Sequence, residues 1–226
     1  MADYDTPHYP IFLDLTGRLA VVVGGGPVAE RKVRTLLRYG ADVAVIAPEV
    51  TEPLHELSDE QRITVEWRGY ASGDLEGAFL VICATDSEEV NRAVHAEAES
   101  RGQLVNVVDV PELCNFIVPS VVRRGPLQIA ISTGGAAPAV AKRIRRWLTL
   151  EYGDEWEVYV RLLGDMRPLV MERVEEPAAR KAIFETIADS DLLVRITRGE
   201  RPTPEEVFAE FAGEQGGATG DGREEE

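Results

Sequence analysis

Three things are scarce in this sequence: cysteine, long apolar runs and, over one stretch, acidic residues. Only two of the 226 residues are cysteine, Cys83 and Cys114, which excludes a disulfide framework and a cysteine-rich zinc site. No apolar run approaches the roughly 20 residues that a membrane-spanning helix needs. The first residues have neither the basic start nor the apolar segment of a signal peptide. We therefore expect no membrane association and a reducing, cytoplasmic location.

Acidic residues outnumber basic ones. The chain has 40 Asp and Glu against 24 Lys and Arg, a net charge of −16 at pH 7. This excess argues against non-specific binding to nucleic acid. It also suits a halophile, because concentrated salt screens the repulsion among the acids. That hypothesis predicts a protein that unfolds when salt is removed.

The most informative segment is a glycine-rich turn. An apolar strand over Leu19–Val23 runs into Gly24, Gly25 and Gly26, and a helix is predicted to follow at once. With Ala29 the spacing is G-x-G-x-x-A, which is typical of dinucleotide sites. Gly24 permits a tight turn, and Gly26 has no side chain to hold a pyrophosphate away from the backbone.

The helix start supplies the phosphate donors. Pro27 suits a first helical turn but has no N–H. The amides of Gly25, Gly26 and Val28 are therefore expected to hold the phosphates at the positive end of the helix dipole. The alternative interpretation is a tight turn that binds nothing.

The context favours the nucleotide site. The predicted helix ends at Gly40, a C-terminal cap glycine, and Asp42–Ile46 follows as a second buried strand. The same alternation continues to residue 108, which predicts a doubly wound α/β fold. Beyond the first unit, the expected strands are 63–67, 78–84 and 104–108, and the expected helices are 51–57 and 88–101.

The pattern changes after Asn115. Two strands, 116–122 and 127–132, are predicted to form a hairpin with a turn at 123–126. A helix over 139–151 follows, then helices near 155–166, 177–189 and 204–211. The glycine- and acid-rich residues 213–226 are expected to be disordered.

From Leu113 to Leu150 the chain has no Asp or Glu. A basic island in so acidic a protein predicts a polyanionic ligand, although a solvated helix face is the alternative. Its six cations are Arg123, Arg124, Lys142, Arg143, Arg145 and Arg146.

Asp109 follows the last predicted strand at its carboxyl end, where open α/β sheets bind ligands. A carboxylate there can act as a general base. The alternative is a residue that only caps the turn before Pro111.

Several short motifs in order resemble one family, the siroheme-synthase N-terminal family of precorrin-2 dehydrogenases, some of which are also sirohydrochlorin ferrochelatases. The resemblance covers residues 9 to 151 and does not include the large methyltransferase domain of the fused bacterial enzymes. The motifs are Tyr9–Leu15, Val23–Lys32, Ala84–Asp86, Asn106–Asp109, Asn115–Pro119 and Ser132–Gly135.

The resemblance implies an NAD-dependent homodimer that oxidises precorrin-2 to sirohydrochlorin. It implies a Rossmann NAD-binding domain (1–114), a dimerisation and tetrapyrrole-binding segment (115–150), a helical domain (151–212) and the acidic tail (213–226). Asp109 matches the catalytic aspartate of the family. The implied cofactor contacts are Gly24, Gly25, Gly26, Pro27 and Val28 at the pyrophosphate, Ala47, Pro48 and Glu49 near the adenosine ribose, and Ala84, Thr85 and Asp86 beside the cofactor. Glu49 favours NAD, because a 2′-phosphate beside it would be repelled; Arg31 and Lys32 weaken this preference.

Precorrin-2 is a polycarboxylate, so the acid-free island suits it, since arginines pair with carboxylates in a bidentate geometry. The predicted substrate contacts are Asn106, Arg123, Arg124, Ser132, Thr133, Gly134, Gly135, Lys142, Arg143 and Arg146. No metal site is predicted, because the three histidines lack a ligand spacing. Ferrous or cobaltous ion remains open as a second substrate. Another Rossmann oxidoreductase and an NAD-binding regulatory module are the alternative functions.

Overall fold

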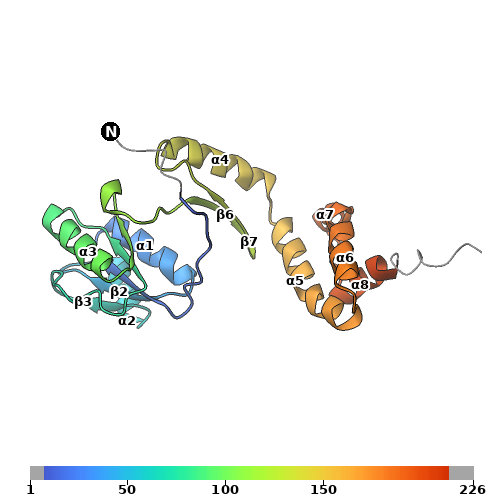
Figure 1. The fold of residues 1–226 in the computed structure, drawn as a ribbon, viewed down its shortest axis with the longest axis horizontal. Helices are drawn as coiled ribbons and strands as arrows, with labels where there is room; N and C mark the ends of the chain where they lie inside the picture. The colour runs from blue at the N-terminus through green and yellow to red at the C-terminus, as the bar shows by residue number, and fades with distance from the viewer. Residues whose placement is uncertain (1–7, 214–226) are drawn as a thin grey trace, which may run out of the picture. The chain divides into compact units, whose positions relative to one another are not determined.

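The computed structural model describes residues 8–213. Its contacts divide the chain into two compact units, with the boundary in sequence between Val118 and Pro119 (Figure 1). Each unit has its own apolar core, so each is considered by itself. No helix among the described residues is long and apolar enough to cross a membrane.

The first unit contains a five-stranded parallel sheet in the order β3-β2-β1-β4-β5. The two strands at the centre of the sheet, β1 and β4, are buried on both faces, which explains their nearly continuous apolar sequences, whereas the edge strand β3 is largely exposed. They are β1 (Leu19–Val23), β2 (Asp42–Ile46), β3 (Thr64–Glu66), β4 (Leu80–Cys83) and β5 (Leu104–Val107). β1 pairs with both β2 and β4, Val22 lying opposite Val45 and Ile82.

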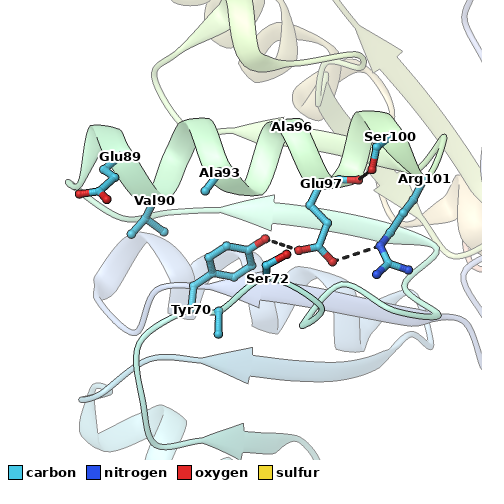
Figure 2. A pocket seen from close by; sticks show the side chains of 10 residues that line it. Tyr70, Ser72, Glu89, Val90, Ala93, Ala96, Glu97, Ser100 and Arg101 are labelled. Carbon is cyan, nitrogen blue, oxygen red and sulfur yellow. Dashed lines mark hydrogen bonds and ion pairs between the residues drawn. The ribbon is translucent and has the colours of Figure 1, made fainter.

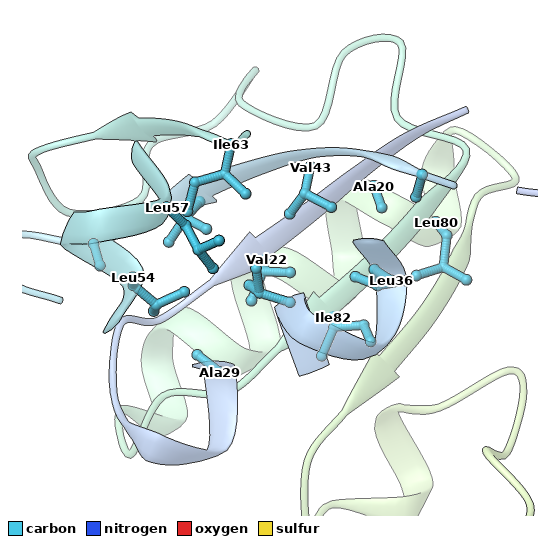
Figure 3. Packing of buried hydrophobic residues seen from close by; sticks show 14 of the residues in the cluster. Ala20, Val22, Ala29, Leu36, Val43, Leu54, Leu57, Ile63, Leu80 and Ile82 are labelled. Carbon is cyan, nitrogen blue, oxygen red and sulfur yellow. The ribbon is translucent and has the colours of Figure 1, made fainter. Parts of the chain in front are cut away.

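Alternate residues of the strands contribute to two separate cores. Ala20 and Val22 pack with α1 (Pro27–Arg38) and α2 (Glu52–Asp59), as Figure 3 shows. Val21 and Val23 pack in the other core, with α3 (Glu88–Ser100). The α/β fold expected from the sequence is confirmed.

The strand order reverses between β1 and β4. The chain passes from β1 outward to β2 and β3, and then returns to β4 beside β1. In doubly wound sheets a ligand binds at the carboxyl ends of the strands at this switch point. The glycine turn at Gly24 follows β1, and Ala84 follows β4, so both lie at that position.

The second unit begins with an antiparallel hairpin, β6 (Ser120–Arg124) and β7 (Leu127–Ile131), which packs against α4 (Pro138–Glu151). The expected turn at 123–126 is wrong. Arg123 and Arg124 lie within β6, where they pair with Gln128 and Leu127. The turn is confined to Gly125 and Pro126, because β6 continues through both arginines: Arg123 faces solvent, and Arg124 on the opposite face donates to the carbonyl of Thr149 on α4.

A cluster of helices completes the second unit. These are α5 (Glu155–Arg173), α6 (Pro177–Asp189), α7 (Leu192–Thr197) and α8 (Pro204–Gly213). Their core contains fully buried Met166, Val170, Ile187 and Leu192. α5 extends past the expected end at residue 166 and continues through Pro168. α7 was not expected. From residue 214 onward, the tail that was expected to be disordered lies outside the described residues. The expected boundary between a tetrapyrrole-binding segment ending at residue 150 and a helical domain beginning at residue 151 stays a prediction.

Candidate functional site

Two of the three glycines have tight surroundings. Gly24 has φ +118°, and a Cβ there would collide with the carbonyl of Ala84. A Cβ on Gly25 would collide with the carbonyl of Glu49 and lie 2.9 Å from the Cα of Val50. Glycine at both positions thus allows the loops after β1, β2 and β4 to approach one another.

Gly26 is different, because it faces open space. A Cβ at this position would meet nothing within 4 Å, and the residue is exposed. Side-chain packing therefore does not require glycine here, and the backbone at Gly26 is open to the close approach of a ligand.

The first turn of α1 offers free donors beside Gly26. Pro27 has no N–H, and the amide of Glu30 donates to the carbonyl of Gly26 at 3.0 Å. Among the described residues, no backbone carbonyl accepts from the amides of Gly25, Gly26 or Val28. These N–H groups at the positive end of α1 fit a diphosphate, as dinucleotide binding requires.

A buried polar side chain on α3 holds the loop after β4 in place. Asn91 on α3 accepts a hydrogen bond from the Cys83 thiol at 3.1 Å and donates to the carbonyl of Thr85 at 3.3 Å. Burial raises the pKa of Cys83 to about 12, so the thiol remains neutral at pH 7. Thr85 and the exposed Asp86 are thereby fixed at the switch point, and Asn91 is a residue that the sequence patterns missed.

The end of β2 forms the opposite wall of the turn. Ala47 is buried and its amide donates to the carbonyl of Glu66 at 3.1 Å, whereas Pro48 and Glu49 are exposed. Glu30 of α1 accepts from the Thr51 hydroxyl at 2.9 Å. This bond ties α1 to the start of α2 and leaves the carboxylate of Glu49 facing solvent near the turn.

Asp109 lies immediately after β5 in an unusual backbone conformation. Its φ of +61° is in the left-handed region, which non-glycine residues seldom adopt. The side chain is exposed at the carboxyl end of the sheet. A strained backbone at such a position is typical of functional sites.

The predicted substrate residue Asn106 has an internal role in the structure. Its amide donates to the carbonyl of Phe116 at 3.0 Å. Asn115 completes the same clamp, accepting from the Val105 amide at 2.8 Å and donating to the carbonyl of Gln103 at 2.8 Å. These bonds hold residues 114–116 along β5 and so fix the loop that carries Asp109.

Lys32 of α1, which the sequence analysis weighed beside Arg31 in the choice between NAD and NADP, is half-buried. Burial lowers the pKa of Lys32, and the neighbouring Arg31 lowers it further.

The remaining predicted substrate residues lie in the second unit. The guanidinium of Arg124 donates to the carbonyls of Arg123 and Thr149 and forms an ion pair with Asp154 at 3.4 Å, so it supports the junction of β6 with α4. Arg123 donates to the carbonyl of Gly125 at 3.3 Å. Both side chains thus have partners within the chain.

The α4 cations differ from these two. Lys142, Arg143 and Arg146 are exposed, and none of them forms an ion pair with any residue between positions 8 and 213. They remain available to an external anion.

The loop before α4 is shaped by its own hydroxyl groups. Ser132 accepts from the amide of Gly134 at 3.0 Å, and Thr133 accepts from the amide of Ala137 at 3.2 Å. Gly134 and Gly135 both have positive φ, which glycine adopts without strain.

A hollow of about 560 Å³ lies away from the glycine turn, between the loop at Tyr70 and α3 (Figure 2). Its polar groups are bonded to one another. Glu97 accepts from the Tyr70 hydroxyl at 2.5 Å and from the Gly73 amide at 2.9 Å, and pairs with Arg101 at 3.1 Å. This network anchors the loop to α3.

The parallel sheet, the glycine turn and the free amides at its switch point define an NAD(P)-binding domain of the Rossmann type. A family model described as putative NAD(P)-binding matches residues 11–120, and a second, described as sirohaem biosynthesis protein central, matches residues 124–149.

Known proteins match along most of the chain. It is 36% identical over 198 residues to a siroheme synthase of Nitrosococcus oceani and 41% identical over 197 residues to one of Ectopseudomonas mendocina, matches that cover 88% and 85% of this chain but 42% of each relative. The chain thus spans less than half the length of these relatives. A solved structure of SirC, precorrin-2 dehydrogenase, is 28% identical with a TM-score of 0.76, and the match covers 91% of this chain and 100% of that one. The chain is thus similar to siroheme synthases over most of its own length, and to a precorrin-2 dehydrogenase over the whole of that chain.

Proposed function

We propose that this protein oxidises precorrin-2 to sirohydrochlorin with NAD as the oxidant. The observation that carries the proposal is the match to a precorrin-2 dehydrogenase over the whole of that chain. The siroheme synthase names of the other relatives agree with it. The glycine turn and the exposed aspartate at one edge of the sheet supply the groups that this reaction needs.

The chain binds the cofactor mainly through its backbone. The amides of Gly25, Gly26 and Val28 hold the diphosphate, and the exposed carboxylate of Glu49 is placed for the ribose hydroxyls. When bound, NAD supplies the hydride acceptor. Glu49 would repel a 2′-phosphate, so the proposal favours NAD over NADP. Ala84, Thr85 and Asp86 border the cofactor at the switch point.

Asp109 accepts the proton in this proposal. Oxidation of precorrin-2 removes two hydrogens, one as a hydride and one as a proton, and the Asp109 carboxylate takes the proton as a general base. Its exposed position after β5 leaves the carboxylate open to a substrate. The α4 cations Lys142, Arg143 and Arg146, with the Ser132–Gly135 loop, bind the carboxylates of the macrocycle.

The test is anaerobic incubation of the protein with precorrin-2 and NAD. Sirohydrochlorin and NADH should form in equal amounts, each followed by its absorbance. Binding of NAD without turnover would instead identify a regulatory module. A failure of any tetrapyrrole to bind, measured by absorbance titration, would identify a different oxidoreductase.

Metal insertion into the product is a second proposed activity, favoured by the name siroheme synthase of the matched relatives. Insertion of ferrous or cobaltous ion releases two pyrrole protons, and Asp109 is the base within the proposed site. Addition of either ion to the sirohydrochlorin formed in the first assay tests this, with the enzyme-free rate as the control.

We also propose a cytoplasmic homodimer. Both cysteines are free, which suits a reducing compartment. Trp147 and Leu150 on α4 are 62% and 85% exposed, and Val140 is exposed on the same helix. An apolar surface of this kind suits a protein interface. Sedimentation should give a mass near twice the 24.9 kDa of the chain, and a Trp147→Glu variant should sediment as the monomer.

A further inference from the structure

Asp109 lies inside a tight turn at the end of β5. The amide of Val110 donates to the carbonyl of Val107 at 3.3 Å, which closes a four-residue turn with Asp109 at its third position. Asp109 has φ +61°, and a turn with a positive φ at this position favours glycine or asparagine. An aspartate is therefore held in a conformation that its own backbone does not prefer.

The side chain of Cys114 bridges the two ends of this turn. Its sulfur lies 3.2 Å from the amide nitrogen of Val107, 3.2 Å from the carbonyl oxygen of Val107 and 3.4 Å from the carbonyl oxygen of Val110. These atoms belong to the first and last residues of the turn around Asp109. A cysteine can contact both kinds of group, since its sulfur accepts a hydrogen bond and its thiol donates one.

Cys114 also supplies a partner that the edge of the sheet needs. β5 is the last strand in the sheet order, so the backbone groups on its outer side have no neighbouring strand. Asn115 bonds to the backbone of Val105 and Gln103, and the Cys114 sulfur accepts from the amide of Val107. Cys114 is half-buried, and burial raises the pKa of its thiol, so the thiol keeps its proton at pH 7.

We propose that Cys114 is a positioning residue for Asp109, its sulfur bridging both ends of the turn and thereby imposing the left-handed conformation of the aspartate at the carboxyl edge of the sheet. The inference deepens the proposed function and rests on it only for the role given to Asp109. The bridge itself is a property of the folded chain.

The first experiment measures the strain at residue 109 without substrate or cofactor. Asp109→Gly should raise the equilibrium constant for folding of the first unit about threefold to tenfold, because glycine adopts a positive φ without strain. In a Cys114→Ala background the same change should give no gain, because the turn is then free to relax. Hydrogen exchange of the β1 and β4 amides measures the stability of this unit by itself.

Gln61 offers a matched control. It is the other residue besides glycine that has a positive φ within positions 8–213, at +56°, and its amide donates to the carbonyl of Ser58 after α2. Gln61→Gly should therefore raise the folding constant equally in the wild type and in Cys114→Ala. A gain from Asp109→Gly that persists in Cys114→Ala overturns the proposal, whatever the enzymatic activity.

The second experiment separates positioning from packing. Cys114→Ala should lower the kcat for precorrin-2 about tenfold or more, since small displacements of a catalytic group are costly, with the KM and the dissociation constant of NAD little changed. Cys114→Ser keeps a donor and an acceptor and should restore most of the turnover. A thiol that only filled space would be replaced better by alanine than by serine, so that order of turnover overturns the proposal.

The same variants distinguish the two proposals. In an Asp109→Ala background, Cys114→Ala should have no further effect on turnover. Weakened NAD binding with normal turnover in Cys114→Ala would assign the residue to the cofactor site and overturn its role toward Asp109. Absence of turnover in the wild type would contradict the proposed function and leave the folding constants as the deciding measurement.

Discussion

The two units present their candidate binding groups in different ways. In the first unit the groups are mostly backbone amides, held by the glycine turn at the carboxyl end of β1, which pairs in parallel with β4. In the second unit they are long cationic side chains on α4 and hydroxyl groups in the loop before it. A backbone site is rigid and recognises a group common to many cofactors, whereas flexible cations suit a polyanion of irregular shape.

The two units should also differ in how strongly a substitution affects ligand binding. A side chain added to the glycine turn changes the shape of the site itself, but a single cation removed from α4 leaves two others exposed. We expect changes in the first unit to have large effects that do not depend on salt, and changes in the second unit to have small effects that do.

The largest effect is expected for Asp109, the side chain to which the proposed function assigns the proton transfer. Asp109→Ala should lower turnover about 10²- to 10⁴-fold, the range for loss of a general base, with little change in NAD binding. Steady-state kinetics and calorimetric titration with NAD test this. Glu112→Ala, a change of another exposed acid in the segment after β5, is the control. Near-normal turnover in Asp109→Ala would remove the aspartate from the mechanism.

The glycine turn should separate folding from binding. Gly24→Ala should destabilise the first unit by about 3 kcal/mol, because φ of +118° is unfavourable and the Cβ collides with Ala84. Gly26→Val should fold normally, since nothing lies within 4 Å, but should weaken NAD binding about tenfold to a hundredfold by loss of phosphate contacts.

Chemical denaturation and NAD titration measure the two effects. Gly69→Ala is the matched control, because its surroundings are equally open and lie outside the turn. Equal loss of stability in Gly24→Ala and Gly26→Val would contradict the distinction between a packing glycine and a binding glycine.

The two units also differ in how well the sequence predicts their structure. The fold of the first unit was predicted well. Parallel strands that are covered on both faces have apolar sequences, and a glycine after a helix marks where the backbone adopts a positive φ and the helix ends. Gly40 has positive φ after α1, as a C-terminal cap glycine should, and Gly102 has positive φ after α3. The glycine turn was interpreted from its context, because glycine-rich turns are common but this one joins a buried strand to a helix in a βαβ unit.

The second unit was harder to predict. Arg123 and Arg124 looked like turn residues, yet both lie in β6, where Arg123 is exposed and Arg124 on the opposite face donates to the carbonyl of Thr149 on α4. Pro168 indicated a helix end, but Met166 and Val170 on either side are fully buried, and their packing keeps α5 continuous. Tertiary contacts of this kind are not encoded in local patterns.

Asn91 was missed for a related reason. A polar residue on a helix face gives no sign in the sequence that it is buried against a strand, and only the fold brings it to Cys83.

The cations of α4 provide the next test of the comparison. Arg143→Gln combined with Arg146→Gln should raise the KM for precorrin-2 roughly threefold to tenfold, the size expected for exposed ion pairs. Added salt should reduce the difference between variant and wild type, because it screens exposed charges. NAD binding should stay the same.

Matched controls for the α4 cations lie on the neighbouring helices. Arg161→Gln and Lys181→Gln remove exposed cations that already pair with Glu157 and Glu185. They should leave the KM unchanged. An equal rise in the KM in these controls would show that overall charge, and not α4, attracts the substrate.

The smallest effect concerns the acid stability of each unit. Burial acts to raise the pKa of Glu97, but hydrogen bonds from Tyr70, Gly73 and Leu75 outweigh it and hold the pKa below its ordinary value. The stability that Glu97 contributes is therefore present above that ordinary value and is lost as the pH falls through the lowered one. Tyr70→Phe should cost the first unit about 1 kcal/mol at neutral pH and progressively less in acid.

Tyr159 in the second unit is the matched comparison. Its hydroxyl donates to the backbone carbonyl of Ile187 at 3.3 Å, a neutral acceptor that does not titrate. Tyr159→Phe should therefore weaken the second unit by a similar amount at neutral and acid pH. Hydrogen exchange of β1 and β4 amides, set against those of α5 and α6, reports the two units separately. A cost of Tyr70→Phe that did not change with pH would show that the phenol packs against α3 without stabilising the ionised form of Glu97.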